Sequence, residues 1–378
     1  MGNTGWTSDG AGWRAGLGGV RRKVLGQLVA GLLMGWAAGA SAGQAGVSGR
    51  AARGAEDAGL EKTVAAMAAA HHGQVALFAE DLKTGRTVGL RPDEPVQTAS
   101  VIKLGILYHA MEEVREGRAR WDEKLTLKPG EAVGGSGMLH FFDAPLTVTL
   151  KDVLTMMVIV SDNTATNMAI DRFGVDAINA RVEGLGLKNT HLYKKVMKPA
   201  TEPMPADQPK FGLGKTTPRE MAALMADIGE CRLRRSGRAS AGGAEVGQGF
   251  EAMDAGDRAV CEVALGMLKS QFYRETIPRY LEAVDTTEEG PAIASKTGSL
   301  NAVRNDVAIV SGKSGPMVVS IFTYENKDHG WTVDNEAEVT IAKLGKAIAD
   351  AWTPGGLDAK GLVPGLGMGA NDGTVRLN

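Results

Sequence analysis

Strand-like segments lie near both ends of this chain, and segments with helical periodicity fill its middle. Short or alternating apolar runs predict strands at 74–81, 87–90, 292–296, 306–310 and 317–323. A sheet must bury at least one face against other elements. The pattern therefore predicts an α+β fold. An antiparallel sheet flanked by helices is built from both ends of the chain, and an all-helical lobe over about residues 100–290 is inserted between them.

Apolar residues three and four positions apart mark the helices. Thr149 and Asp152 match the capping box with which a helix begins. The segment 194–215 is rich in Pro, Lys and Gly, and we expect a long ordered loop there. The predicted helices are 59–70, 100–116, 150–160, 164–172, 176–183, 218–228, 258–269 and 336–352.

The first 42 residues have the pattern of a secretory signal. Arg21, Arg22 and Lys23 precede an apolar run over 24–38, and small residues follow at 40–42. An uncleaved membrane anchor is the alternative, which the shortness of the run and its glycines disfavour. We therefore expect a periplasmic or secreted protein. Its parts are a signal over 1–42, a linker over 43–56, a catalytic domain over 57–352 and a disordered Gly/Pro-rich tail over 353–378.

Composition argues against several functions. A net charge of −2 gives no electrostatic basis for binding nucleic acid or, apart from the export signal, a membrane. The six histidines lack zinc-binding spacing, so no metal or cofactor is expected. The segment 134–137 is a flexible loop without the Lys-Ser/Thr of a phosphate-binding loop. The nearby Leu139, Phe141 and Phe142 are assigned to the core rather than to the mouth of a cleft. The protein is expected to be a monomer.

The chain has only two cysteines, Cys231 and Cys261. They flank a Gly-, Ser- and Arg-rich insertion over 236–249, at the ends of two predicted helices. An exported protein can keep a disulfide, which would fix the ends of that insertion. Two buried thiols are an equally good interpretation.

Ser100-Val101-Ile102-Lys103 places a serine and a lysine three residues apart at the predicted start of a helix, where their side chains share a face. A serine hydroxyl is a poor nucleophile until a base takes its proton. Lys103 could be that base if burial and a second cation lowered its pKa. Free backbone N–H groups at the helix start suit a developing oxyanion. By itself, however, the motif is more often an N-cap serine followed by a surface lysine.

Ser161-Asp162-Asn163 lies between two predicted helices. By itself it indicates only a helix cap at Asp162 or Asn163. In an active site, Ser161 would relay a proton toward a leaving nitrogen. Asn163 would hold the substrate amide and orient Lys103.

Lys296-Thr297-Gly298 ends a predicted strand and, by itself, indicates an ordinary turn. In an active site, Lys296 and Thr297 would bind a substrate carboxylate, and Gly298 would let the ligand lie close to the strand. The N–H of Ser299 is a candidate oxyanion donor. Arg304 is a candidate for a second contact with the carboxylate.

Together and in this order, the three motifs resemble those of the class A β-lactamase and penicillin-binding-protein superfamily. The similarity covers roughly residues 64–352 and is closest at 98–104, 150–167 and 296–306. The family's fold, an antiparallel sheet with flanking helices plus a helical lobe, agrees with the predicted order of elements. The resemblance implies that Ser100 is acylated and that Lys103 activates it. Ser161, Asn163, Lys296, Thr297 and Gly298 then match the second and third motifs.

One departure from that family concerns release of the acyl group. In class A β-lactamases an acidic residue between the second and third motifs hydrolyses the acyl-enzyme through a water. Without a gap in the comparison, Val196 falls at that position, among lysines. Glu202 or Asp207 could substitute only if the loop were rebuilt. The resemblance therefore implies acylation but leaves the group that activates the deacylating water unassigned.

Three functions fit these observations. The first is an exported serine hydrolase that opens β-lactam amides through a Ser100 acyl-enzyme. The second is a D,D-carboxypeptidase or esterase that acts on peptidoglycan peptides and deacylates slowly, which the missing acidic residue motivates. The third is a catalytically silent module that binds cell-wall fragments, although the intact serine–lysine pair argues against it.

Overall fold

A five-stranded antiparallel sheet combines strands from the N-terminal and C-terminal parts of the domain, as predicted. The computed structural model of the chain describes residues 55–200, 203–233, 255–281 and 291–362. The strands of the sheet are β1 (Gln74–Asp81), β2 (Thr87–Leu90), β8 (Ile293–Leu300), β9 (Val303–Gly312) and β10 (Gly315–Tyr324). They lie in the order β2-β1-β10-β9-β8, so that β1 from the start of the chain pairs with β10 from its end.

The C-terminal strands are longer than predicted. The sequence pattern ends one strand at Lys296, but β8 continues to Leu300 and pairs with β9 as far as Val303. Lys296-Thr297-Gly298 therefore lies inside an edge strand and not in a turn after it. The apolar pattern stops before this polar stretch, so only the pairing with β9 reveals the rest of the strand.

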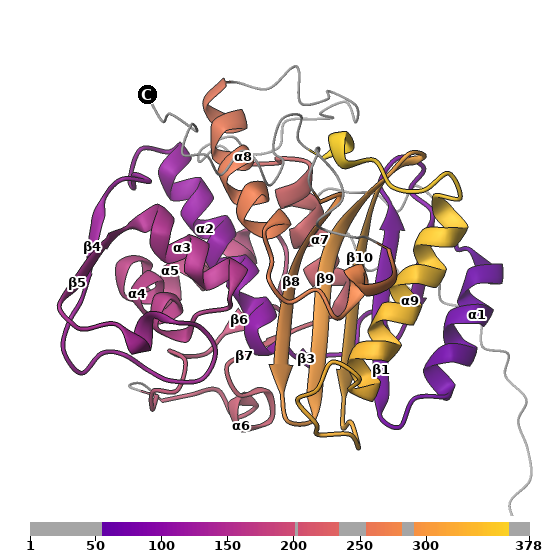
Figure 1. The fold of residues 1–378 in the computed structure, drawn as a ribbon, viewed down its shortest axis with the longest axis horizontal. Helices are drawn as coiled ribbons and strands as arrows, with labels where there is room; N and C mark the ends of the chain where they lie inside the picture. The colour runs from indigo at the N-terminus through magenta and orange to yellow at the C-terminus, as the bar shows by residue number, and fades with distance from the viewer. Residues whose placement is uncertain (1–54, 201–202, 234–254, 282–290, 363–378) are drawn as a thin grey trace, which may run out of the picture. The chain divides into compact units, whose positions relative to one another are not determined.

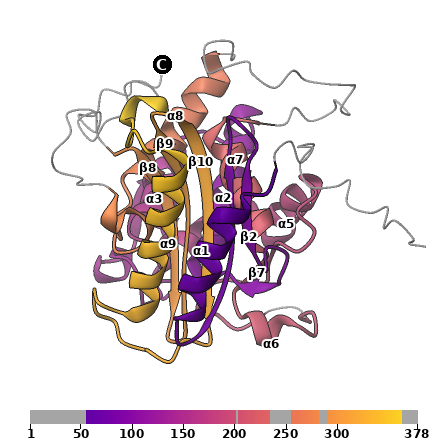
Figure 2. The same cartoon turned by 90° about the vertical axis from the view of Figure 1, so that its right-hand side faces the viewer.

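Helices cover both faces of the sheet and build a lobe beside it (Figures 1 and 2). Each predicted helix is present, with ends shifted by up to three residues. No helix within the described ranges has the length and apolarity needed to cross a membrane. The helices are α1 (Ala58–Ala69), α2 (Lys103–Arg115), α3 (Leu150–Ile159), α4 (Asn163–Phe173), α5 (Val175–Gly184), α7 (Pro218–Gly229), α8 (Ala255–Lys269) and α9 (Glu336–Trp352).

The sheet separates two hydrophobic cores. Side chains along a strand point alternately to its two faces. Val75 and Leu77 of β1 join the core formed with α1 and α9. Ala76 and Phe78 join the core formed with α7 and the helical lobe. The sheet therefore carries helices on both faces, and the helical lobe meets it on the side of α7.

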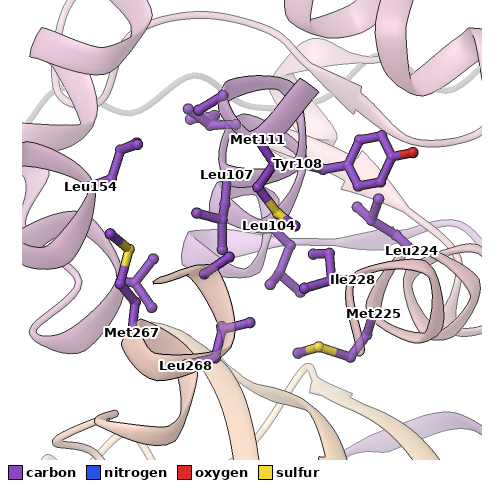
Figure 3. Packing of buried hydrophobic residues seen from close by; sticks show 14 of the residues in the cluster. Leu104, Leu107, Tyr108, Met111, Leu154, Leu224, Met225, Ile228, Met267 and Leu268 are labelled. Carbon is purple, nitrogen blue, oxygen red and sulfur yellow. The ribbon is translucent and has the colours of Figure 1, made fainter. Parts of the chain in front are cut away.

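The helix that carries Lys103 is buried over its whole length except its last three residues. In α2, Leu104, Leu107, Tyr108 and Met111 are each 0% exposed. Burying a side chain of this size contributes about 1.5–3 kcal/mol, so packing fixes the position of α2. The partners that Figure 3 labels are Leu154 of α3, Leu224, Met225 and Ile228 of α7, and Met267 and Leu268 of α8.

Several short elements escape prediction because they are too short for periodicity to show. The expected α-helix at Ser100 begins instead at Lys103, after a 3-10 turn. The loop expected over 194–215 holds a short helix and the start of a strand. These elements are β3 (Val96–Gln97), β4 (Lys124–Leu127), β5 (Leu146–Thr149), β6 (His191–Leu192), β7 (Gly214–Thr216), α6 (Gln208–Phe211), η1 (Ala99–Ile102), η2 (Leu139–Phe141), η4 (Ile277–Tyr280) and η6 (Ala359–Gly361).

The predicted ends of the domain need correction. Leu357 forms an antiparallel β-bridge with Gly312. Leu362 belongs to the hydrophobic core and is only 2% exposed. The first ten residues assigned to the disordered tail are therefore packed on the fold. At the other end, Glu56 pairs with Thr87, so the linker ends earlier than predicted. The proposed signal, most of the linker, the insertion over 236–249 and the tail beyond residue 362 lie outside the described residues.

The structure joins Cys231 and Cys261 in a disulfide, which settles the alternative left open by the sequence. Cys231 follows α7, Cys261 lies in α8, and their Cα atoms are 5.7 Å apart. Both residues are buried in the core that contains α2. The bridge therefore ties together two helices that pack against the helix carrying Lys103.

We expect a double variant, Cys231→Ser with Cys261→Ser, to unfold more easily and yet keep its chemistry. A bridge that spans 30 residues should contribute about 3–4 kcal/mol by restricting the unfolded chain. Urea unfolding of both proteins, with and without a reductant, measures this. Reductant should lower the stability of the parent protein alone. Equal unfolding free energies in the absence of reductant would contradict the prediction.

Candidate active site

Ser100 lies in the tight turn η1, directly before α2. Ala99 has a φ of +45°, an uncommon value for a residue with a side chain. The N–H of Val101 donates to the carbonyl of Thr98 at 3.0 Å, and the N–H of Lys103 donates to the carbonyl of Ser100. Ser100 itself is partly exposed. The turn thus presents the serine one helical turn before Lys103.

The amine of Lys103 is buried and surrounded by acceptors. Its Nζ lies 2.7 Å from the carbonyl oxygen of Ser161, 3.1 Å from the Ser161 hydroxyl and 3.2 Å from Asn163 Oδ1. Burial lowers the pKa of Lys103 well below its usual value, and the nearby charge of Lys296 acts in the same direction, against Asp162. Both effects disfavour the ammonium form, so Lys103 is suited to accept a proton.

Ser161 connects the two lysines. The Nζ of Lys296 lies 3.1 Å from the Ser161 hydroxyl and 2.8 Å from the carbonyl of Thr297. Because a hydroxyl can accept two hydrogen bonds and donate one, Ser161 can accept from both amines and still offer its own proton to a third group. Burial lowers the pKa of Lys296 to about 7, opposed by the charge of Asp306.

The turn around Ser161 is fixed by its neighbours. Ser161 has a φ of +54°, which a residue with a side chain adopts only where its surroundings enforce it. Asp162 is fully buried and caps α4 by accepting from the N–H of Ala165 at 2.8 Å. Its other oxygen accepts from the N–H groups of Met138 and Leu139 at 2.6 and 2.8 Å. The predicted cap at Asp162 is therefore present, and it leaves Ser161 and Asn163 turned toward Lys103.

The glycine loop over 134–137 is an ordered part of this site, contrary to the expectation of a flexible loop. Gly137 has a φ of +103°, and a Cβ added there would lie 2.3 Å from atoms of Asp162. The amide of Asn163 donates to the carbonyl of Gly134 at 3.1 Å. The cluster of glycines is the one sequence signal that a backbone segment packs closely here. Only the folded chain shows that this segment packs against the Ser161 turn.

Two aromatic residues beside this loop are placed differently from the prediction. Leu139 is 5% exposed and belongs to the core, as expected. Phe141 and Phe142 are 79% and 52% exposed. The short turn η2 ends at Phe141, and the chain leaves the core there, so the apolar character of these residues does not indicate burial.

Gly298 brings β8 against the turn that carries Ser100. A Cβ at Gly298 would lie 2.7 Å from the carbonyl oxygen of Thr98 and 2.8 Å from the N atom of Ser100. Only glycine leaves room for this approach. The expected reason for Gly298 was space for a ligand, whereas the structure shows that the residue makes room for the backbone at Ser100. Thr297 is buried and Ser299 is partly exposed on the same strand.

Arg304 does not join these residues, which corrects its expected role at a substrate carboxylate. Its Nε donates to Glu338 of α9 at 3.0 Å. Its terminal nitrogens donate to the carbonyls of Leu300, Val303 and Gly330. Four of the five N–H donors of an arginine are thereby used. The side chain is 1% exposed, with Trp331 stacked over it at 4.3 Å.

Val196 is held in place by Asn167 of α4. The N–H of Val196 donates to Asn167 Oδ1 at 2.8 Å, and the Asn167 amide donates back to the Val196 carbonyl at 3.0 Å. The loop therefore fixes an apolar residue where the sequence comparison expects an acid. Asp207 is bound to Tyr193 and Lys215 at 2.8 and 2.6 Å, and Glu202 lies outside the described residues. Among the described residues, no cluster of His, Cys, Asp and Glu could hold a metal ion.

A sequence model of the beta-lactamase enzyme family matches residues 59–240 and 244–352, which is more than half of the chain. The chain belongs to the beta-lactamase enzyme family. As a member it is a β-lactamase-like serine hydrolase, and membership implies a small β-lactam as the class of substrate.

Solved structures share the β-lactamase fold of this chain. The crystal structure of a beta-lactamase from Sphaerobacter thermophilus is 28% identical, covers 78% of this chain and 96% of its own, and superimposes with a TM-score of 0.61. The structure of PBP-A is 23% identical, covers 79% of this chain and 97% of its own, and superimposes with a TM-score of 0.60. At this identity the similarity is evidence for a shared fold only.

A curated relative matches a shorter part of this β-lactamase-family chain. The beta-lactamase regulatory protein BlaB of Streptomyces cacaoi is 33% identical over 88 residues. The match spans 23% of this chain and 28% of the length of BlaB.

Binding of a negatively charged lactam should weaken as the pH rises above neutral. Because the pKa of Lys296 is lowered to about 7, its amine is charged below that pH and neutral above it. Loss of a hydrogen bond to a charged group costs about 1.5–3 kcal/mol, so we expect the dissociation constant of a penicillin to rise about tenfold or more between pH 6 and pH 9.

The matched control is Lys296→Arg, which keeps its charge throughout this range. Stopped-flow measurement of the initial complex gives the dissociation constant in both proteins. A flat pH dependence in the parent protein, or the same rise in the arginine variant, would contradict the assignment of this titration to Lys296.

Proposed function

We propose that this enzyme opens β-lactam amides by acyl transfer to Ser100. The observation that supports this proposal is the convergence of the Lys103 and Lys296 amines on the hydroxyl of Ser161, beside the turn that presents Ser100. A serine or lysine with only a structural role does not require two buried amines around one hydroxyl. Two fully buried lysines that share one hydroxyl are costly for folding, and their lowered pKa values suit proton transfer.

In the proposed reaction, neutral Lys103 takes the proton of the Ser100 hydroxyl. The serine oxygen bonds to the lactam carbonyl carbon. The N–H groups of Ser100 and Ser299 donate hydrogen bonds to the carbonyl oxygen, which becomes negatively charged. The lactam C–N bond then breaks, and Ser161 donates its proton to the released nitrogen. The proton taken by Lys103 returns to Ser161 through their hydrogen bond, which restores the starting state of both groups.

Substrate binding is assigned to the strand and to the Ser161 turn. Charged Lys296 and the hydroxyl of Thr297 would hold the carboxylate of the lactam. Asn163 would donate to the amide of the acyl side chain while its oxygen keeps Lys103 in place at 3.2 Å. Gly298 acts indirectly, by letting β8 approach the turn at Ser100.

A second candidate function, a penicillin-binding protein with slow deacylation, is favoured by Val196. An apolar side chain cannot activate a water, and the two hydrogen bonds from Asn167 hold its backbone in place. The acyl-enzyme would then persist, as in a D,D-peptidase or esterase of the same fold whose natural substrate is a peptidoglycan peptide.

We also propose that the enzyme is exported to the periplasm or secreted. The support comes from the basic and apolar pattern of the first 42 residues and from the disulfide between Cys231 and Cys261. Disulfides persist mainly outside the reducing cytosol. The N-terminal sequence of the mature protein, with cleavage near residue 42 as the expected result, tests this.

Incubation with penicillin G should add the mass of the intact antibiotic to the protein, at Ser100. Ser100→Ala removes the nucleophile and should remain unmodified. Intact-protein mass spectrometry over time measures the adduct, and peptide mapping locates it. An adduct on another residue, or equal labelling of the variant, would refute the proposal. An adduct that lasts for minutes to hours supports the penicillin-binding function, whereas one that clears within seconds supports a β-lactamase.

Val196→Glu should shorten the lifetime of the acyl-enzyme. The backbone at this position is already fixed, so the new carboxylate could act as a general base on a water, an effect typically worth 10²–10⁴-fold in rate. We expect deacylation to rise by about tenfold or more. Val196→Gln, which has nearly the same size but no basic group, is the matched control. Equal acceleration by both variants would show that loop disruption, and not base catalysis, admits the water.

A further inference from the structure

Asn305 connects β9 to the backbone directly before Ser100. It lies opposite Gly298 in the pairing of β8 with β9 and is 1% exposed. Its Nδ2 donates to the carbonyl oxygen of Gln97 at 2.9 Å and to that of Thr98 at 3.1 Å. Both amide hydrogens are thus used on the segment that leads into η1.

The carbonyl of Thr98 is the point where these contacts meet. It accepts from Asn305 and also from the N–H of Val101, the bond that closes the turn around Ser100. A side chain on Gly298 would collide with this same oxygen. The side chain of Asn305 and the bare backbone of Gly298 therefore determine together where the turn sits against β8.

The turn needs such support because it is strained. Ala99 holds a φ of +45°, and a strained conformation of this kind persists only where the surroundings enforce it. Without the two bonds from Asn305, the segment could relax toward ordinary backbone angles. Ser100, the next residue, would move with it.

Energetics point to a geometric role for Asn305 and not to a role in stability. The net free energy gained from two hydrogen bonds is about as large as the cost of burying one acceptor without a partner. Asn305 Oδ1 is such an acceptor: it is buried and has no hydrogen-bond partner among the described residues. The side chain therefore adds little net free energy, and its main effect is on the position of the turn.

We propose that Asn305 is a positioning residue for acylation, which holds the Ser100 turn in register with Lys296-Thr297-Gly298. This inference depends on the proposed role of Ser100 as the nucleophile. The bond to be made joins the Ser100 oxygen to a carbonyl carbon bound along β8, so the relative placement of turn and strand decides its rate. A misplacement of about 1 Å can cost about 100-fold.

The test replaces the amide by a group of the same shape that cannot donate twice. Asn305→Asp places carboxylate oxygens against the two carbonyls. Its matched control is Asn335→Asp, since Asn335 is also fully buried and its Nδ2 also donates to two carbonyls, of Asp328 and Gly330, at 3.2 and 3.0 Å. Stopped-flow acylation by a chromogenic cephalosporin separates the dissociation constant of the initial complex from the rate of the chemical step, and thermal unfolding reports stability.

We expect the chemical step of Asn305→Asp to fall about 10- to 100-fold, with the dissociation constant changed by no more than about twofold. Asn335→Asp should lose stability, because its carboxylate faces two carbonyls, and keep the rate of the parent. A rate within about threefold of the parent for folded Asn305→Asp, or an equal loss in Asn335→Asp, would overturn the proposal, because a purely structural residue would not single out the chemical step.

Asn305→Ser decides the matter in the same assay if the aspartate variant does not fold. It keeps one hydroxyl donor, and the same selective loss of the chemical step is expected. Failure of both variants to fold would overturn the proposal, because it would make Asn305 essential for stability. If the parent protein acquires no adduct at Ser100, the proposed function itself fails. If the parent reacts and the Asn305 variants react equally fast, only the role of Asn305 fails.

Discussion

The site depends on two lysine amines that are buried together around one hydroxyl. Lys103 and Lys296 are both 0% exposed, and each lies 3.1 Å from the hydroxyl of Ser161. Burial lowers the pKa of both amines, and the charge of Lys296 lowers that of Lys103 further. The lowered pKa of Lys103 suits it to accept a proton, and the pKa of Lys296 is lowered to about 7. The arrangement requires α2, the Ser161 turn and β8 to meet at one point.

The surrounding structure keeps that meeting point fixed. Ala99 and Ser161 hold positive φ angles next to the reacting groups, and strained backbone of this kind persists only where contacts enforce it. For Ser161 the contacts come from its neighbours: buried Asp162 accepts from the N–H groups of Met138 and Leu139, and Asn163 donates to Gly134 of the glycine loop. For the turn at Ser100 they come from β8 and β9, across Gly298. The burial of residues 103–112 of α2, in the core that also contains the Cys231–Cys261 disulfide, keeps the helix in place.

The structure holds more of the groups proposed for acylation than of those proposed for release of the acyl group. The amines of Lys103 and Lys296 and the hydroxyl of Ser161 come together in contacts near 3 Å, beside the turn that carries Ser100. Val196 lies where an ungapped comparison with class A β-lactamases expects an acid, and Asn167 fixes its backbone there. Family membership establishes a β-lactamase-like serine hydrolase, but the balance between these two steps separates a hydrolase from a penicillin-binding protein.

The sequence alone determined the fold class, the β1–β2 hairpin and the main helices, because those depend on local periodicity. Its motifs also named four residues that the structure brings into contact, Lys103, Ser161, Asn163 and Lys296. Tertiary structure decided the rest. In the folded chain Arg304 pairs with Glu338, and Phe141 is exposed. The glycine loop contacts Asn163, and Asn305 binds the backbone that leads into the Ser100 turn. Each of these depends on contacts between segments far apart in the chain, and no pattern within either segment records which partner it will meet once folded.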